Sequence, residues 1–153
     1  MVTDGEAAGI EALTAEHAPA EVVTVAPSEL AGLEGQWFDD IVFYGADADA
    51  IEAAAALLGS RATFCLVLGG ERIGRKVNLD IGRVHYDFIR FVGTTGSDPA
   101  DGYAWVPATG ELRAGDKVAI IGAAGPMGTM HTIRAVTSGV EGISVTGTDV
   151  STD

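Results

Sequence analysis

The sequence predicts an α/β fold built on a mainly parallel, doubly wound sheet. Short, almost wholly apolar runs at residues 41–44, 63–68 and 118–121 are typical of strands that are covered on both faces. Runs that favour helix lie at residues 50–58 and 126–137. Strands that alternate with helices in this way indicate parallel β-α-β units.

The first elements are weakly marked. Residues 1–20 are rich in Ala and Glu, and we expect them to be weakly structured, with one short helix at residues 9–13. A strand is expected at residues 21–25, where Pro27 follows it. One or two helical turns are expected at residues 28–33.

The next strand, at residues 41–44, ends at Gly45. Asp47 or Asp49 can cap the helix that follows. Asp49 and Glu52 have the spacing of a capping box, and Gly59 fits the end of the helix.

A second doubly apolar strand at residues 63–68 ends in two glycines. A third strand is expected at residues 83–92, and the glycines of residues 93–96 end it. Residues 97–116 then form a connector with turn residues, in which we expect a short helix around residues 103–105.

The last part of the chain carries the most informative motif. A strand at residues 117–121 leads into Gly122-Ala-Ala-Gly125-Pro-Met-Gly128, where Pro126 suits the first helical position. Glycines three apart between a strand and a helix let the backbone approach a pyrophosphate, which the helix N-terminus then binds. The motif therefore predicts a dinucleotide site, although a tight strand-helix connection in another kind of α/β protein has the same pattern.

The strand expected at residues 143–149 ends at Asp149, which lies 21 residues beyond Gly128. A carboxylate at this place accepts hydrogen bonds from a ribose 2′-hydroxyl and repels a 2′-phosphate. No Lys or Arg follows at residues 150–151 to offset that repulsion. NAD is therefore favoured over NADP, with a simple turn cap as the alternative role of Asp149.

The glycine-loop unit closes the chain, whereas a Rossmann-type domain usually begins with it. We expect a Rossmann-like domain at residues 21–153, with a later-strand half (21–96), the connector (97–116) and a glycine-loop half (117–153). Two explanations of this order stay open. Either the chain completes a circularly permuted six-strand sheet, equivalent to the order 3-2-1-4-5-6, or it is truncated and its halves await missing neighbours.

Composition excludes some partners. The 153 residues are 47% hydrophobic, and 22 acidic against 9 basic side chains give a net charge of −13, which disfavours nucleic acid and anionic membranes. Cys65 is the single cysteine and lies in an apolar run, so we expect a buried, inert thiol and no cysteine zinc cage. No signal peptide or membrane span is recognisable, so a cytoplasmic location is expected.

Other candidate residues have simpler interpretations. If residues 83–92 form a strand, His85 and Asp87 share a face, which favours a structural pair over a proton relay. Met127 and Met130 are expected in the core beside the helix that carries them. His131, in the first turns of the same helix, is expected to be structural or solvent-exposed.

Several segments together resemble one family. Phe38-Asp-Asp-Ile-Val-Phe-Tyr-Gly45, Leu66-Val-Leu-Gly69, Val84-His-Tyr86, Gly93-Thr-Thr-Gly96 and the glycine motif are similar to the cofactor domain of zinc-type medium-chain alcohol dehydrogenases. The sugar-alcohol and sorbose-phosphate dehydrogenase branch is the most similar. The resemblance covers roughly residues 21–153, with the glycine motif after the later strands rather than before them.

The resemblance implies a set of cofactor-binding residues. Those expected to hold the pyrophosphate are Gly122, Ala123, Gly125, Pro126, Met127 and Gly128, and Asp149 is expected to bind the adenosine ribose. Those expected to border the nicotinamide ring are Gly45, Leu68, Gly69, Gly93 and Thr94.

The family also has a catalytic domain that holds zinc through Cys, His and Glu, including a Gly-His-Glu segment that this sequence lacks. We therefore expect an NAD-binding module of an oxidoreductase that transfers hydride between NAD and an alcohol or carbonyl, without catalysis by this chain alone. Zinc would come from a separate catalytic domain, and that domain or a second copy of the chain is the expected protein partner. The alternatives are a non-catalytic nucleotide-binding or subunit-interaction module, or a truncated fragment.

Overall fold

The computed structural model describes residues 1–5, 7–106 and 112–150. The chain divides into two compact units, unit 1 (Met1–Val106) and unit 2 (Pro107–Asp153), which are described separately. Part of the expected connector, at 107–111, and the last three residues of the chain lie outside the described residues.

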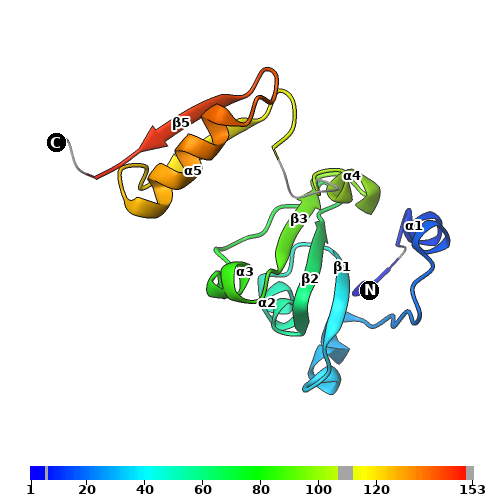
Figure 1. The fold of residues 1–153 in the computed structure, drawn as a ribbon. Helices are drawn as coiled ribbons and strands as arrows, with labels where there is room; N and C mark the ends of the chain where they lie inside the picture. The colour runs from blue at the N-terminus through cyan, green and yellow to red at the C-terminus, as the bar shows by residue number, and fades with distance from the viewer. Residues whose placement is uncertain (6, 107–111, 151–153) are drawn as a thin grey trace. The chain divides into compact units, whose positions relative to one another are not determined.

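Unit 1 is built on a three-stranded parallel sheet. Its strands are β1 (Phe38–Tyr44), β2 (Leu58–Val67) and β3 (Arg90–Thr94), in the order β1-β2-β3 (Figure 1). Successive side chains of each strand point to opposite faces, and both faces are covered. The apolar runs at residues 41–44 and 63–68 therefore lie in strands, as predicted.

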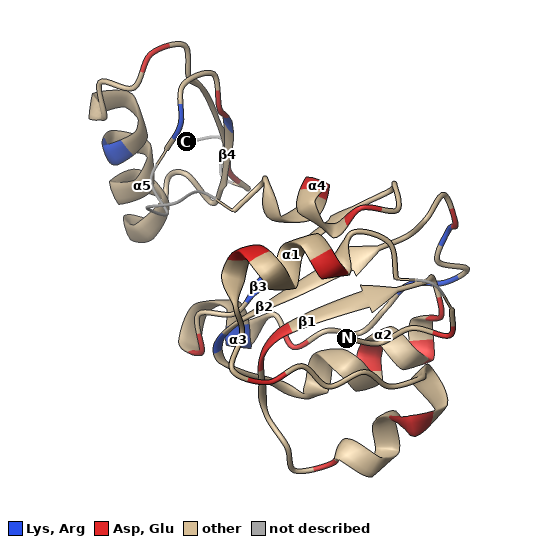
Figure 2. Ribbon diagram, turned by 90° about the vertical axis from the view of Figure 1, so that its right-hand side faces the viewer, with Lys and Arg blue, Asp and Glu red and all other residues tan. Residues whose placement is uncertain are grey.

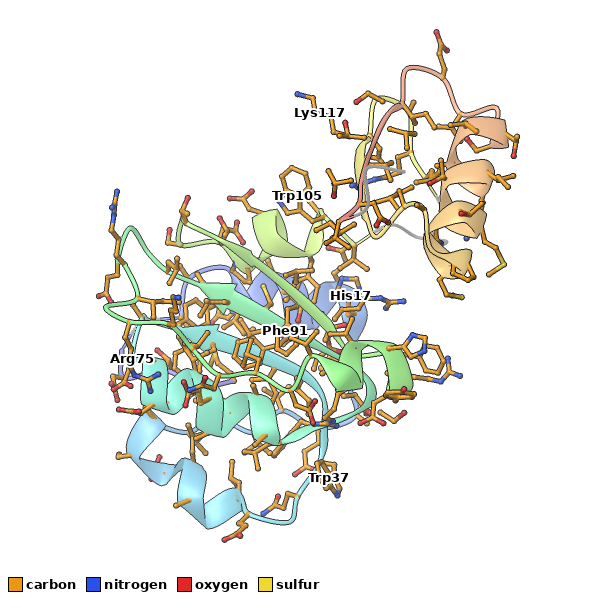
Figure 3. The ribbon with its side chains drawn as sticks, turned by 90° about the vertical axis from the view of Figure 1, so that its left-hand side faces the viewer. His17, Trp37, Arg75, Phe91, Trp105 and Lys117 are labelled. Atoms are coloured by element: carbon orange, nitrogen blue, oxygen red, sulfur yellow. The ribbon has the colours of Figure 1, made fainter. Side chains whose placement is uncertain are left out.

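One face of the sheet packs against helix α2 (Ala48–Ala56) and the 3-10 helix η1 (Pro27–Leu33). Phe43 and Phe64 are almost fully buried there, with ring centroids 6.1 Å apart. Phe91 lies 5.9 Å from Phe64 and extends this aromatic row among the side chains between the sheet and α2 (Figure 3). This row is the centre of the larger core of unit 1.

The opposite face packs against helices α1 (Ile10–His17) and α4 (Pro99–Tyr103). Val42, Cys65 and Val67 are buried on this face, against Ile10 and Leu13 of α1 and Tyr103 of α4. Cys65 is fully buried, as the sequence predicted. Helices therefore lie on both faces of the sheet.

The start of α2 differs from the expected capping box. Of the two candidate caps, Asp47 is the N-cap, and its carboxylate accepts hydrogen bonds from the backbone N–H groups of Asp49 and Ala50. Glu52 instead forms an ion pair with Arg75, a residue that lies beside α2 in Figure 3. The helix also stops before Gly59, which belongs to β2.

Two predicted strands are wrong. Residues 21–25 contribute only an isolated bridge between Val25 and Val2, which also bridges to Phe43 of β1. The expected strand at residues 83–92 begins as helix α3 (Gly82–Tyr86), and only its end is extended, as β3. An ion pair one helical turn apart, between Arg83 and Asp87, favours the helical start.

Unit 2 is a single β-α-β unit. Strand β4 (Lys117–Ile121) and strand β5 (Ser144–Thr148) pair in parallel, and helix α5 (Pro126–Thr137) connects them (Figure 1). The predicted bounds of β4 and α5 agree with the structure, and β5 is one residue shorter at each end than predicted. The apolar run sets the strand, and proline sets the start of the helix.

The core of unit 2 is small. Of its described residues, Ile120, Gly128 and Ala135 are buried. Met127 and Met130 are 56% and 57% exposed, so the expectation that they lie in the core is wrong. Gly128 and Ala135 lie seven residues apart on one face of α5, and these small residues face the strands, so the larger apolar side chains point outward.

The structure is therefore an α/β fold with parallel sheets. Its described residues form a three-stranded and a two-stranded sheet, with five strands rather than the six expected. A single permuted sheet made from both units stays a prediction.

Candidate functional site

The predicted glycine loop connects β4 to α5 and is held by the end of β5. The backbone N–H groups of Gly122 and Ala123 both donate to the carbonyl oxygen of Thr148, at 2.8 and 3.0 Å. Gly122 has a φ of 77°, a conformation that favours glycine. The N–H of Gly125 then donates to the carbonyl of Gly122, which closes a tight turn.

Gly128 is required by the close approach of α5 to this loop. A Cβ atom on Gly128 would lie 2.0 Å from the carbonyl oxygen of Gly122 and 2.7 Å from Cα of Ala123. On β5, a Cβ atom on Gly147 would lie 2.8 Å from Cβ of Ala123. The loop is therefore packed tightly between the helix and the strand, and its conformation depends on both glycines.

Two side chains fix the loop further. The Asp149 carboxylate accepts a hydrogen bond from the backbone N–H of Ala124 at 2.9 Å. The hydroxyl of Thr129, in the first turns of α5, donates to the carbonyl of Ala123 at 3.2 Å. Asp149 thus lies against the glycine loop, at the end of β5. Its contact with Ala124 stabilises the turn, which is the alternative role that the sequence left open for this residue.

The start of α5 has the features of an anion site. Gly125 is its N-cap and Pro126 its first residue, and among the described residues no side chain caps it. The N–H groups of Met127 and Gly128 lie in the first turn, where a helix offers them no acceptor, and the helix dipole adds partial positive charge. Backbone amides beside a narrow glycine turn are the donors that a diphosphate requires.

Unit 1 contains a separate hollow of about 370 Å³ at the carboxyl ends of β1 and β2. Gly45, Leu68 and Gly69, three of the residues assigned to the nicotinamide ring by resemblance, line it together. The carboxyl ends of parallel strands are where α/β proteins usually bind their ligands.

The other two residues of that set do not line the hollow. A Cβ atom on Gly93 would lie 2.5 Å from the carbonyl oxygen of Leu66, so this glycine serves the packing of β3. Thr94 is tied into the following turn, because its hydroxyl accepts a hydrogen bond from the N–H of Gly96.

The hollow is acidic. Asp4, Asp47 and Glu71 line it, and its described lining residues include no Lys, Arg or His. Such a lining suits a neutral or cationic group better than a phosphate. The sequence did not predict that Thr3 and Asp4, in the N-terminal segment, line this hollow. This segment reaches the hollow because the backbone of Val2 pairs with β1, a contact without a local sequence signal.

Buried titratable groups lie beside these strands. Burial raises the pKa of Tyr44 to about 12, and its hydroxyl donates to the carbonyl of Ala8 at 2.8 Å. Burial likewise raises the pKa of the Cys65 thiol to about 11. Burial also raises the pKa of Asp40, whose carboxylate accepts a hydrogen bond from Tyr103 at 3.3 Å. At neutral pH the Tyr44 hydroxyl and the Cys65 thiol therefore stay protonated, so they serve packing rather than nucleophilic chemistry.

The remaining sequence candidates do not form a site. His85 lies in α3, its ring 4.8 Å from that of Tyr86, and Asp87 pairs with Arg83, so the expected pairing of His85 and Asp87 on a strand face is wrong. His131 is exposed on α5.

Within the described residues, no group of three or more His, Cys, Asp or Glu is placed to hold a metal ion. No helix in the same part of the chain has the length and apolar character that crossing a membrane requires. Comparisons with protein-family models, with curated proteins and with solved structures each find no match to this chain.

Proposed function

We propose that this chain binds NAD through the glycine loop of unit 2, as the cofactor module of an oxidoreductase that acts on an alcohol or polyol. The observation that carries the proposal is the uncapped start of α5 beside a loop in which Gly128 leaves no room for a side chain. The proposal includes a Rossmann-like, doubly wound arrangement with this unit at the C-terminal end.

The residues of the loop fit a diphosphate. A Cβ atom on Gly122 would meet no atom within 4 Å, so the absent side chain leaves the backbone accessible there. The first-turn amides of Met127 and Gly128 supply donors, and the hydrogen bonds to Thr148 hold the loop in shape before any ligand binds. A preformed loop lowers the entropy cost of binding.

Asp149 supports NAD rather than NADP. Its carboxylate lies beside the loop, at the end of β5, where a ribose hydroxyl can donate to it and a 2′-phosphate meets like charge. The same carboxylate holds Ala124, so Asp149 both shapes the loop and selects the nucleotide.

The role of the hollow in unit 1 rests on the resemblance. Gly45, Leu68 and Gly69 are assigned to the nicotinamide ring by that likeness, and their acidic, cation-free surroundings suit a neutral or positively charged ring. When bound, NAD supplies the hydride acceptor for alcohol oxidation, while this chain's residues bind and orient it. The zinc that polarises the substrate in the similar family would come from a separate catalytic domain.

One observation favours a second function, that of a subunit-interaction module. Met127, Met130, Ile133 and Val136 of α5 are each more than half exposed, which is unusual for apolar side chains on a helix. A protein that self-associates without binding NADH would support this alternative.

Calorimetric titration of the full chain with NADH and NADPH tests the proposal. We expect NADH to bind at least roughly tenfold more tightly, since one uncompensated charge contact is worth about 1.4 kcal/mol or more. In Asp149→Asn the side-chain oxygen can still accept from Ala124, so NADH binding should persist while the preference over NADPH shrinks. Asp149→Ala should weaken both. Equal affinities in the unaltered protein would contradict the role given to Asp149, and no binding would contradict the function.

A further inference from the structure

An exposed cluster of aromatic and arginine side chains lies at the amino ends of the strands of unit 1. We call it the aromatic-arginine patch, and its members are Trp37, Arg61, Arg83, Val84, Tyr86 and Phe88. Trp37, Tyr86 and Phe88 are 67%, 79% and 57% exposed. Trp37 projects from the body of the unit in Figure 3. Exposed rings gathered in one place mark an interaction site more often than a solvated surface.

The patch is ordered by its own contacts. The guanidinium of Arg83 lies 5.8 Å from the ring of Trp37, and that of Arg61 lies 5.1 Å from the ring of Phe88. Arg83 also donates to the carbonyl of Leu58 and pairs with Asp87, both at 2.6 Å. These contacts limit the rotamer freedom that binding would otherwise remove, which favours association.

Two members of the patch have a backbone conformation that side chains rarely adopt. Arg61 has a φ of 66° and Phe88 a φ of 57°, and the N–H of Arg61 donates to the carbonyl of Asp87, next to Phe88. Left-handed backbone is unfavourable for residues other than glycine. Two large side chains at such positions indicate that the side chains themselves are needed there.

The charge of the patch differs from that of its unit. Residues 1–106 hold six of the 9 Lys and Arg residues and seventeen of the 22 Asp and Glu residues. Basic residues nevertheless gather at α3 and the start of β3, as Figure 2 shows. Arg61 is exposed and forms no ion pair with any described residue. An unpaired guanidinium beside exposed rings fits a carboxylate next to an apolar side chain.

We propose that the aromatic-arginine patch docks an acidic segment of another polypeptide, in which carboxylates alternate with aromatic or aliphatic side chains. Trp, Tyr, Phe and Arg are enriched at protein interfaces, and Trp, Tyr and Arg dominate their binding energy. A symmetric contact between two copies of this patch would place Arg61 and Arg83 next to the same two arginines of the second copy. Because like charges repel, such a contact is disfavoured. Nucleic acid would meet the repulsion of a chain with a net charge of −13.

Fluorescence anisotropy with three labelled probes tests this docking site. The probes are a twelve-residue peptide of alternating Glu with Trp or Leu, its Gln counterpart, and a twelve-nucleotide oligothymidine. We expect the Glu peptide to bind roughly tenfold or more tightly than the Gln peptide, since charge-assisted hydrogen bonds are the stronger ones. Its affinity should fall as salt rises, because screening weakens exposed charge contacts.

Variants connect the binding to the patch. Arg61→Glu should weaken Glu-peptide binding at least roughly tenfold, whereas Arg72→Glu, the same charge change in the loop after β2, should not. Phe88→Gly removes the ring and relieves the positive φ, so thermal unfolding followed by circular dichroism should show a folded protein that has lost binding. Val22→Ala, a truncation at another half-exposed apolar residue, is the matched control.

Three outcomes would overturn the proposal. In the first, the Glu and Gln peptides bind equally, or Phe88→Gly and Arg61→Glu bind like the unaltered protein. In the second, the oligonucleotide alone binds. In the third, sedimentation shows a dimer that Arg61→Glu dissociates, which would assign the patch to a second copy.

Discussion

Units 1 and 2 share the same β-α-β construction but use it differently. All but two of the buried hydrophobic residues that the structure describes lie in unit 1, where helices cover both faces of the sheet. In unit 2 the exceptions are Ile120 and Ala135, and the helix meets the strands through small residues. Unit 1 buries side chains, whereas unit 2 brings backbone close to backbone.

If the glycine loop binds a diphosphate, as proposed, the difference shows how such a site competes with a hydrophobic core. Gly128 is buried, so a larger residue there would add buried apolar surface, yet a Cβ atom on Gly128, or on the exposed Gly147, would displace the glycine loop. A bare backbone can donate to a diphosphate but contributes little hydrophobic stabilisation. We therefore expect unit 2 to gain much of its stability from its ligand, and unit 1 to be stable by itself.

The largest expected effect is on the core of unit 1. Phe43→Ala should lower its free energy of unfolding by about 3–5 kcal/mol, because the ring is buried between the sheet and α2. Both tryptophans, Trp37 and Trp105, belong to unit 1, so urea unfolding followed by tryptophan fluorescence reports on this unit. Ile133→Ala, at a residue of α5 that is 55% exposed, is the control and should leave that midpoint unchanged. Equal shifts would show that the contrast between the units is false.

A smaller effect should separate ligand binding from the stability of unit 1. Gly128→Ala places a Cβ atom 2.0 Å from the carbonyl of Gly122, so the loop must move and NADH affinity should fall at least roughly tenfold. The fluorescence midpoint of unit 1 should not change. Gly125→Ala, whose Cβ would lie 3.4 Å from the same carbonyl, should weaken binding less. Unchanged NADH affinity in Gly128→Ala would remove the reason given for this glycine.

The smallest effect concerns a surface ion pair of unit 1. Arg75 pairs with Glu52 and Asp49, and it lowers the pKa of Glu52. A lowered folded-state pKa stabilises the protein above the unfolded pKa and loses that contribution as pH falls through the folded pKa. Arg75→Ala should therefore lower the urea midpoint slightly at pH 7, and the difference should vanish in acid. A large loss at pH 7 would show that this exposed pair matters more than exposed pairs usually do.

The sequence predicted the elements that local signals determine. Pro126 and the apolar run before the glycine loop set the bounds of α5 and β4, and the continuous apolar run around Cys65 placed that residue in the core. The glycine spacing predicted a tight loop between β4 and α5, and the structure brings Gly128 of α5 close to that loop. The approach of a pyrophosphate to the loop stays a prediction.

The rest depends on contacts between distant residues. Arg83 reaches the carbonyl of Leu58, 25 residues away, and that contact supports a helix where alternation suggested a strand. Val2 pairs with β1 across about forty residues of sequence, so the N-terminal part of the hollow had no local signal. On α5 the larger apolar side chains predicted the face that would be buried. The buried residues are instead the small Gly128 and Ala135, because they let the helix lie close to the strands.

Whether the glycine loop binds a dinucleotide can be seen by nuclear magnetic resonance of the 15N-labelled chain during titration with NADH, because this method reports on each backbone amide. We expect the amide signals of residues 122–125 and 127–128, together with that of Asp149, to shift in a saturable manner. Adenosine alone should perturb the loop less, because it lacks the diphosphate. Saturable shifts confined to other residues, or no shifts at millimolar NADH, would contradict the claim that this loop binds a dinucleotide.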